Sequence, residues 1–105
     1  MRKEPKIEGY WYSEYEPQYP MPKANVLSDS EAQEIYDLII EKQKTARVNS
    51  YKGSSTSRIT QERLGSREFQ TSEWRWPKDF AKHYVLDHKV KPTNEFLEYI
   101  GWLTN

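Results

Sequence analysis

The sequence predicts an α+β fold, with a small antiparallel sheet, about three helices and an extended N-terminal arm. Two segments, 27–45 and 93–103, carry hydrophobic residues at the three- and four-residue spacing of an amphipathic helix. Between them lie short alternating segments separated by turn-forming glycines, a pattern typical of β-strands. A chain of 105 residues has room for one small domain. We therefore expect an arm over residues 1–26 and a single compact α+β domain over residues 27–105.

Aromatic side chains are expected to supply much of the core. Hydrophobic residues make up only 35% of the chain, but the aromatic fraction is 14%. Each aromatic ring buries roughly 150–250 Å² when it packs, so a few rings can support a small core. The predicted core residues are Ile35, Leu38, Ile39, Val48, Phe69, Trp74, Trp76, Phe80, Tyr84, Val85, Phe96, Leu97 and Ile100.

The composition disfavours several classes of protein. The 16 basic and 16 acidic residues give zero net charge, which argues against a general nucleic-acid or membrane-surface binder. No hydrophobic run approaches the ~20 residues that cross a bilayer, and the first residues do not resemble a secretory signal. The absence of cysteine excludes disulfides and thiolate metal sites. We expect a cytoplasmic protein that has no cofactor and is monomeric when free.

The helices are predicted from their caps as well as from their hydrophobic spacing. In the segment Leu27–Thr45, Ser28 and Glu31 have the spacing of a capping box, in which each side chain bonds to the backbone of the other residue. A second helix is predicted over Lys78–His88. Thr93 is the predicted cap of the last helix.

The sheet is predicted from three short segments, 47–52, 66–70 and 73–76. The first places Val48 at a candidate buried position. Pro77 follows the third segment, and because proline lacks a backbone donor, it suits the first position of the next helix.

The arm over residues 1–26 combines tyrosine with proline. Proline fixes φ and removes a backbone donor, so extended structure is predicted, with a short strand considered at residues 10–12. Two roles are open: the rings complete the core, or they recognise a partner. The candidate partner-binding residues are Tyr10, Trp11, Tyr12, Tyr15 and Tyr19.

The most specific spacing joins Ser57, Thr60, His83 and His88. A loop, two strands and a helix with both histidines follow the layout of a ββα zinc finger, in which the first two positions would be cysteines. Neutral hydroxyls are poor zinc ligands, so we interpret the four residues as former metal-ligand positions in a metal-free, degenerate zinc-finger-like centre. We expect a hydroxyl of Ser57 or Thr60 to hydrogen-bond near one of the histidines. One alternative is a weak zinc or nickel site of both histidines with a carboxylate such as Asp87 or Glu62. The other is that these residues do not lie near each other.

Short motifs in the same half of the chain suggest a relationship. They are Tyr51-Lys52-Gly53, Gly65-Ser66-Arg67-Glu68-Phe69, Trp74-Arg75-Trp76-Pro77, His83-Tyr84-Val85, His88 and Val90-Lys91-Pro92. With these motifs the chain resembles a family of small, mostly uncharacterised bacterial and phage proteins. That family carries Cys, Cys and Gly where this chain has Ser57, Thr60 and Gln61. The resemblance implies a zinc-finger-like fold and a bacterial or phage origin, with the host cytoplasm as the location of a phage-encoded protein.

Two functional hypotheses from different classes follow. The first is a small non-catalytic protein-binding module, such as an inhibitor or adaptor, because tyrosine and tryptophan are enriched at interface hot spots. The second is a nucleic-acid-binding zinc-finger relic that uses the stretch 58–78. Its candidate residues are Arg58, Arg63, Arg67, Arg75 and Trp76. The interleaved glutamates favour a salt-bridged strand face instead, with the tryptophans in the core.

A catalytic role is not expected. Ser57 and His83 could pair as nucleophile and base. However, no strained nucleophile turn, phosphate-binding loop or metalloprotease motif accompanies them. We therefore predict that the protein is not an enzyme.

Overall fold

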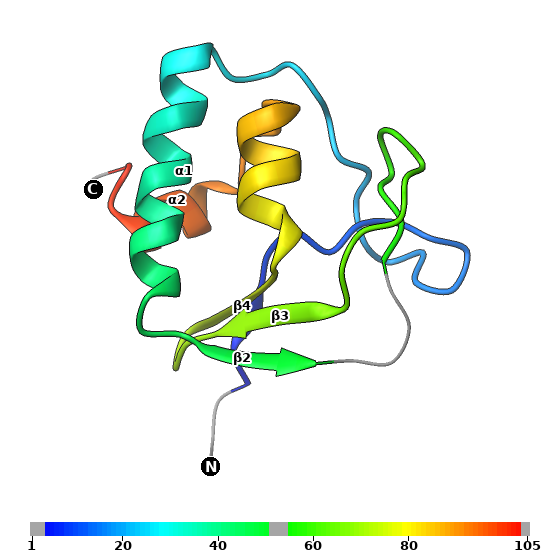
Figure 1. The fold of residues 1–105 in the computed structure, drawn as a ribbon, viewed down its shortest axis with the longest axis horizontal. Coiled ribbons are helices and arrows are strands. Elements are labelled where there is room, and N and C mark those ends of the chain that lie inside the picture. The colour runs from blue at the N-terminus through cyan, green and yellow to red at the C-terminus, as the bar shows by residue number, and fades with distance from the viewer. Residues whose placement is uncertain (1–3, 51–54, 104–105) are drawn as a thin grey trace.

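The computed structural model describes residues 4–50 and 55–103. Within them lie three helices and a four-stranded mixed sheet, which confirms the predicted α+β class. In Figure 1 the helices gather on one side of the sheet. The elements in chain order are β1 (Lys6–Ile7), α1 (Asp29–Gln43), β2 (Arg47–Ser50), β3 (Arg67–Gln70), β4 (Trp74–Pro77), the π-helix η1 (Phe80–Asp87) and α2 (Asn94–Ile100).

The sheet has the order β1-β4-β3-β2 and is antiparallel only in part. Strands β2, β3 and β4 pair antiparallel, as predicted. Strand β1 comes from the arm and pairs parallel to β4, so the expectation of a purely antiparallel sheet is wrong. The expected strand at residues 10–12 is also wrong, because the pairing occurs earlier, at Lys6–Ile7. Two residues are too few to show an alternating pattern, which is why the sequence did not indicate β1.

Helix α1 begins as its sequence predicts. The Ser28 hydroxyl accepts a hydrogen bond from the Glu31 backbone N–H at 3.2 Å, and the Glu31 carboxylate accepts one from the Ser28 N–H at 2.9 Å. This reciprocal pair satisfies two of the donors that a helix start leaves open. Ala32, Ile35 and Ile39 are buried beneath the helix. No helix among the described residues is both long enough and apolar enough to cross a membrane.

The second predicted helix is present, but its winding and its first residue differ from the prediction. It is a π-helix from Phe80 to Asp87. Pro77 is the last residue of β4 rather than the first of the helix. Strand β1 pairs only with Trp74 and Arg75, so the missing N–H of Pro77 lies beyond the end of that ladder.

The core is built around the ring of Phe96. Its centroid lies 5.2 Å from Trp74, 5.5 Å from Trp76 and 5.8 Å from Phe80, each in an edge-to-face arrangement. Such ring pairs contribute roughly 0.5–1.5 kcal/mol beyond the area that they bury. Most of the predicted core is confirmed by the buried residues, which are Leu27, Ala32, Ile35, Ile39, Trp74, Trp76, Phe80, Ala81, Tyr84, Val85, Val90, Phe96, Leu97 and Ile100.

Three predicted core residues are less buried than expected. Leu38 and Phe69 only pack against the core from its margin. Val48 is 50% exposed, so its predicted burial is wrong. Strand β2 is the edge of the sheet, and alternation along a strand cannot show that the strand has a neighbour on only one side.

Glu8 joins the arm to the start of α2. Its buried carboxylate accepts hydrogen bonds from the Thr93 backbone N–H at 2.8 Å and from the Thr93 hydroxyl at 2.9 Å. Burial raises the pKa of Glu8, and the two bonds from Thr93 oppose that change only in part. Thr93 also caps α2 as predicted, because its hydroxyl accepts from the Phe96 N–H at 3.4 Å. One threonine therefore holds both the helix and the arm.

Gly9 lets the arm pass close to the core. Its φ is 80°, and a Cβ added there would lie 2.6 Å from the Phe80 ring. No larger residue fits without moving either the arm or the ring.

Replacing Thr93 by alanine is expected to lower the free energy of unfolding by about 1–3 kcal/mol, because α2 loses its cap and Glu8 loses a donor. Thr93→Ser keeps the hydroxyl and should stay within about 0.5 kcal/mol of the parent. Urea unfolding followed by tryptophan fluorescence measures both variants. Equal midpoints for the two variants would show that this contact does not hold the arm.

Candidate functional site

The loop over residues 55–65 closes on itself before β3. Thr56 and Arg63 form an isolated antiparallel bridge, and the Ser57 N–H donates to the Glu62 carbonyl at 2.8 Å. Gln61 has a φ of 65°, a left-handed conformation that glycine adopts most easily. This is the position at which the resembled family carries glycine. The loop therefore has a tight turn of its own, with Ser57 at its start.

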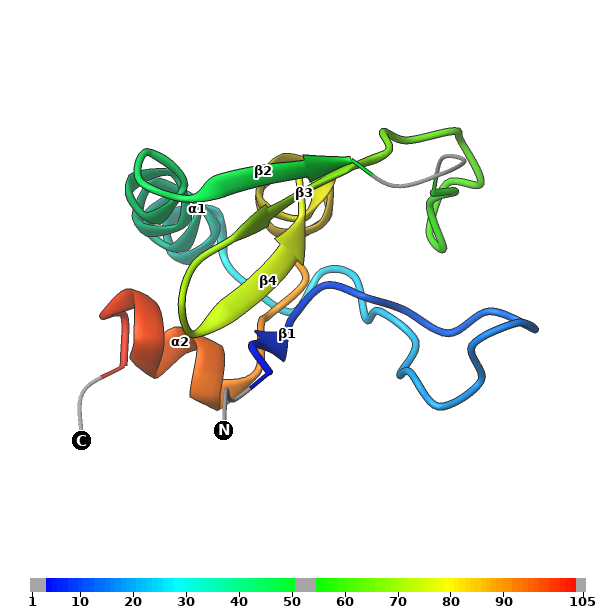
Figure 2. The same cartoon turned by 90° about the horizontal axis from the view of Figure 1, so that it is seen from below.

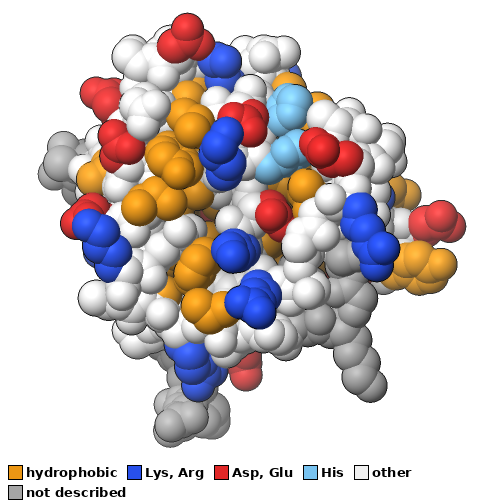
Figure 3. Space-filling model, viewed as in Figure 1, with side chains coloured by type: hydrophobic (Ala, Val, Ile, Leu, Met, Phe, Trp, Pro, Cys, Tyr) orange, Lys and Arg blue, Asp and Glu red, His pale blue; other side chains and the backbone are white. Residues whose placement is uncertain are grey.

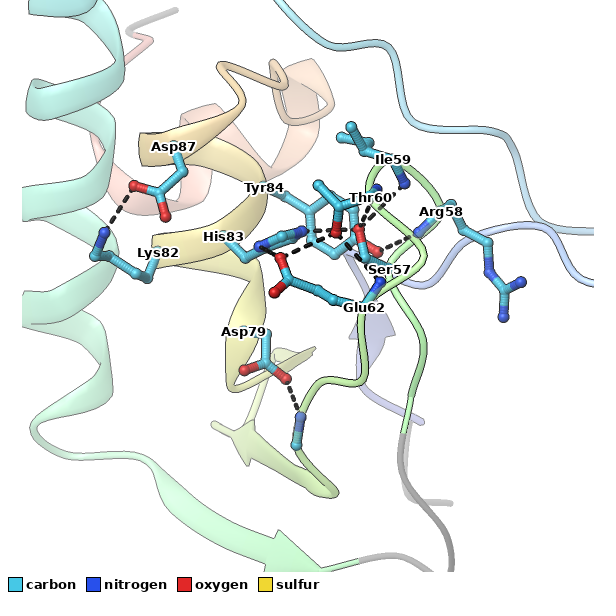
Figure 4. A network of polar contacts seen from close by, with 11 residues as sticks. Ser57, Arg58, Ile59, Thr60, Glu62, Asp79, Lys82, His83, Tyr84 and Asp87 are labelled. Atoms are coloured by element: carbon cyan, nitrogen blue, oxygen red, sulfur yellow. Dashed lines mark hydrogen bonds and ion pairs between the residues drawn. The ribbon is translucent and has the colours of Figure 1, made fainter.

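The Ser57 hydroxyl is the centre of a buried network (Figure 4). Its Oγ accepts hydrogen bonds from the backbone N–H groups of Ile59 at 3.1 Å and Thr60 at 3.0 Å. The same Oγ lies 2.8 Å from His83 Nε2. A hydroxyl has one donor and two acceptor sites, so with both acceptors in use Ser57 donates to His83. The predicted bond between this loop and a histidine is confirmed.

The surroundings of His83 favour its neutral form. Burial lowers the pKa of His83, and the charge of His88 lowers it further, while the carboxylates of Glu62, Asp87 and Asp79 oppose the change. His83 Nδ1 lies 3.5 Å from Glu62 Oε1. A proton on Nδ1 therefore faces a carboxylate, and Nε2 is free to accept from Ser57. In Figure 3 the two imidazoles, in pale blue, appear beside acidic side chains.

The winding of η1 brings the two histidines together. In an α-helix, residues five apart point about 140° away from each other. In η1 the His88 N–H donates to the His83 carbonyl at 3.2 Å, which is the i to i+5 bond of a π-helix. The ring centroids of His83 and His88 are consequently only 4.7 Å apart. The four-residue gap between the histidines was visible in the sequence, but the winding was not.

The four predicted former metal-ligand positions lie close together. Ser57 contacts His83 and His83 contacts His88 through their side chains, whereas Thr60 does not take part through its side chain. Thr60 contacts Ser57 through its backbone, while its own hydroxyl bonds to Glu62 at 2.9 Å. Asp87 pairs with Lys82 at 2.7 Å. Among the described residues, no three or more His, Asp or Glu side chains are placed so that they could hold one metal ion, so the alternative of a weak site with Asp87 or Glu62 has no support. The resembled motif at residues 51–53 lies outside the described residues.

Ser57, His83 and Glu62 also follow the order of a nucleophile, a base and an orienting acid. However, Ser57 has no exposed surface, and its oxygen already accepts two backbone bonds. A substrate cannot approach this oxygen without opening the loop. The arrangement is suited to fastening the loop to η1.

A second feature is a cavity of about 480 Å³ between the arm, the loop and the sheet face opposite the helices. Figure 2 shows the arm and the loop at the same end of the molecule. Of the five candidate partner-binding residues, Tyr10, Trp11 and Tyr19 line this cavity. The Trp11 ring lies 5.4 Å from Tyr84 and 6.4 Å from Phe80, so it packs against the core.

The other two candidates on the arm point to solvent. Tyr12 is 42% exposed and Tyr15 is 91% exposed. The Tyr12 N–H donates to the Pro20 carbonyl at 2.8 Å, and Ser13 and Glu16 form a bridge. The turn that carries the exposed rings is therefore closed by its own backbone bonds. The first role, completing the core, is confirmed for Trp11. Recognition of a partner by the exposed rings of Tyr12 and Tyr15 stays a prediction.

Glu68 lies in the cavity wall, and the sequence did not single it out. Its carboxylate accepts hydrogen bonds from Tyr10, from Asn49 at 3.0 Å and from Arg75 at 3.4 Å. Desolvation raises the pKa of Glu68, but these three donors outweigh it and the pKa lies below its ordinary value. The only sequence indication is that Glu68 precedes the inward-facing Phe69, which directs it to the opposite face.

The candidate nucleic-acid residues do not form a basic and aromatic surface. Trp76 is completely buried and donates to Gln43 at 3.0 Å, so it cannot stack on a base. Arg75 contacts Glu68, and Arg58 lines the cavity. Arg63 and Arg67 are exposed. Alternation along a strand does not show which face of the sheet the helices cover, so the sequence left both the core role and the nucleic-acid role of Trp76 open.

No family model, curated protein or solved structure matches this chain. The resemblance to small bacterial and phage proteins therefore stays a prediction.

Replacing Ser57 by alanine is expected to lower the free energy of unfolding by about 2–3 kcal/mol, because two buried N–H groups and His83 Nε2 lose their partner. Thr60→Ala is the matched control, since it removes the exposed hydroxyl of the same loop and should change stability by about 0.5 kcal/mol or less. Urea unfolding of both variants is the measurement. Similar losses in the two variants would contradict the central role of Ser57.

If the four residues are former metal ligands, the double substitution S57C and T60C should create a tetrahedral site with His83 and His88. Thiolate ligands should then give cobalt absorption bands, and zinc should bind one ion per chain by native mass spectrometry. The parent protein is expected to bind neither metal, and adding His83→Gln should abolish binding in the variant. One zinc ion per chain on the parent would contradict the metal-free interpretation.

Proposed function

We propose that this protein is a small non-catalytic protein-binding module, an inhibitor or adaptor, that engages its partner through the arm. The observation that carries the proposal is where its large exposed hydrophobic side chains lie. Among the described residues there are five, and four of them, Tyr12, Tyr15, Met21 and Val26, come from the arm. Only Val48 lies elsewhere.

The body supports the arm at several points, which favours binding. Strand β1 pairs with β4, Glu8 bonds to Thr93, and Trp11 packs on Tyr84. A segment that is ordered before binding loses less conformational entropy when a partner arrives. Tyrosine side chains bury a large area with few rotatable bonds, so the exposed rings suit an interface.

The two other functional classes have less support. The nucleic-acid hypothesis needs a stacking ring, but Trp76 is 0% exposed and Trp74 is 6% exposed. An enzyme that used Ser57 would need an accessible oxygen, and Ser57 is fully buried. Neither hypothesis accounts for the exposed tyrosines of the arm.

A pull-down from nuclease-treated bacterial lysate tests the proposal, with the full chain as bait and mass spectrometry as the readout. We expect a protein partner on the parent, and retention at least about tenfold lower on the variant with Tyr12→Ala and Tyr15→Ala. Val48→Ala removes an exposed hydrophobic side chain on β2, at the opposite edge of the sheet from β1, so it should keep the partner. Partners lost only on nuclease treatment, or retained equally by both variants, would contradict the proposal.

A further inference from the structure

Two arginines in the cavity have guanidinium groups with few partners. Arg58 uses its backbone N–H to bond to the Tyr84 hydroxyl at 3.2 Å, and in Figure 4 its side chain points away from the serine–histidine network. Among the described residues its guanidinium makes no hydrogen bond or ion pair. Arg75 makes a single long contact of 3.4 Å with Glu68 through Nη1. Its Nε is buried without an acceptor.

A third donor without a partner belongs to Trp11, one of the residues that line the cavity. The indole Nε1 of Trp11 is buried and has no acceptor among the described residues. Buried donors without acceptors are unfavourable and uncommon in folded proteins. Both of these atoms are closed to solvent, so a ligand in the cavity would reach the unpaired guanidinium of Arg58 and the Nη groups of Arg75 instead.

The acidic side chains of the cavity do not supply the missing acceptors. Glu68 already receives hydrogen bonds from Tyr10, Asn49 and Arg75. Glu16 is exposed on the arm turn and accepts from Gln18 at 3.3 Å. The cavity therefore has arginine hydrogen-bond donors next to aromatic rings, and it lacks a free acceptor for their hydrogen bonds.

We propose that the cavity binds a carboxylate of the protein partner, presented beside an aromatic or apolar side chain; this rests on the proposed function. Arginine pairs with carboxylates through two parallel hydrogen bonds. The rings of Tyr10, Tyr19 and Tyr84 provide the apolar walls. A volume of about 480 Å³ is large enough for such a side chain or chain end.

A carboxylate suits this cavity better than a phosphate. Arg58 and Arg75 are balanced by Glu16 and Glu68, so the lining carries no excess positive charge. A dianionic phosphate would meet the Glu68 carboxylate, whereas a monoanion of planar shape can pair with one guanidinium. A nucleic-acid backbone would also gain little from a chain of zero net charge.

The test uses three small probes on the full chain labelled with ¹⁵N: 3-phenylpropionate, the neutral amide 3-phenylpropionamide, and phenyl phosphate. NMR spectra of the arginine Nε–Hε groups report binding directly. We expect 3-phenylpropionate to shift the signals of Arg58 and Arg75 in a saturable manner. The other two probes should bind about tenfold more weakly, because they lack a planar monoanion.

The variant Arg58→Ala should weaken binding of 3-phenylpropionate by about tenfold, since it removes an unpaired guanidinium without touching Glu68. Arg67→Ala is the control, because Arg67 is exposed on β3 and does not line the cavity. Equal binding of the amide, tighter binding of phenyl phosphate, or equal effects of the two substitutions would overturn the carboxylate proposal. If no probe binds while the arm variant still loses its partner, the proposed function stands and the carboxylate site is rejected.

Discussion

The hydrogen bond between Ser57 Oγ and His83 Nε2 fastens the loop over residues 55–65 to helix η1. Arg58 and Thr56 enter the cavity wall from this loop, so the bond also sets the shape of the cavity. One hydrogen bond contributes only about 0.5–1.5 kcal/mol, whereas a structural zinc ion in a finger peptide contributes roughly 10–16 kcal/mol. This bond alone is therefore too weak to stabilise the domain, and most of its stability comes from elsewhere.

The aromatic core supplies that stability. Phe96 contacts Trp74, Trp76 and Phe80, and so joins α2, β4 and η1 around one ring. Helix α1 covers the same core with Ile35 and Ile39. A hydrogen bond between a neutral serine and a neutral histidine is consequently sufficient to hold the loop, because the aromatic core and not this contact stabilises the domain.

One part of the arm contributes to the stability of the domain, and another part contributes to its exposed surface. Its first part belongs to the fold, since β1 extends the sheet and Glu8 bonds to the cap of α2. Its second part carries Tyr12 and Tyr15 outward on a closed turn. Between these parts, Tyr10 and Trp11 form a wall of the cavity. The arm therefore joins the exposed rings to the cavity that Arg58 and Arg75 line.

The sequence by itself determined the features that depend on neighbouring residues. The capping box of Ser28 and Glu31, the cap at Thr93 and the strand of Phe69 each follow from interactions within a few positions. Only the tertiary structure decided the parallel pairing of β1, the exposure of Val48 and the bond between Glu8 and Thr93, which lie 85 positions apart. It also decided the π-winding that brings the rings of His83 and His88 close together. These features depend on which distant segments meet, and periodicity and spacing along a chain carry no information about that choice.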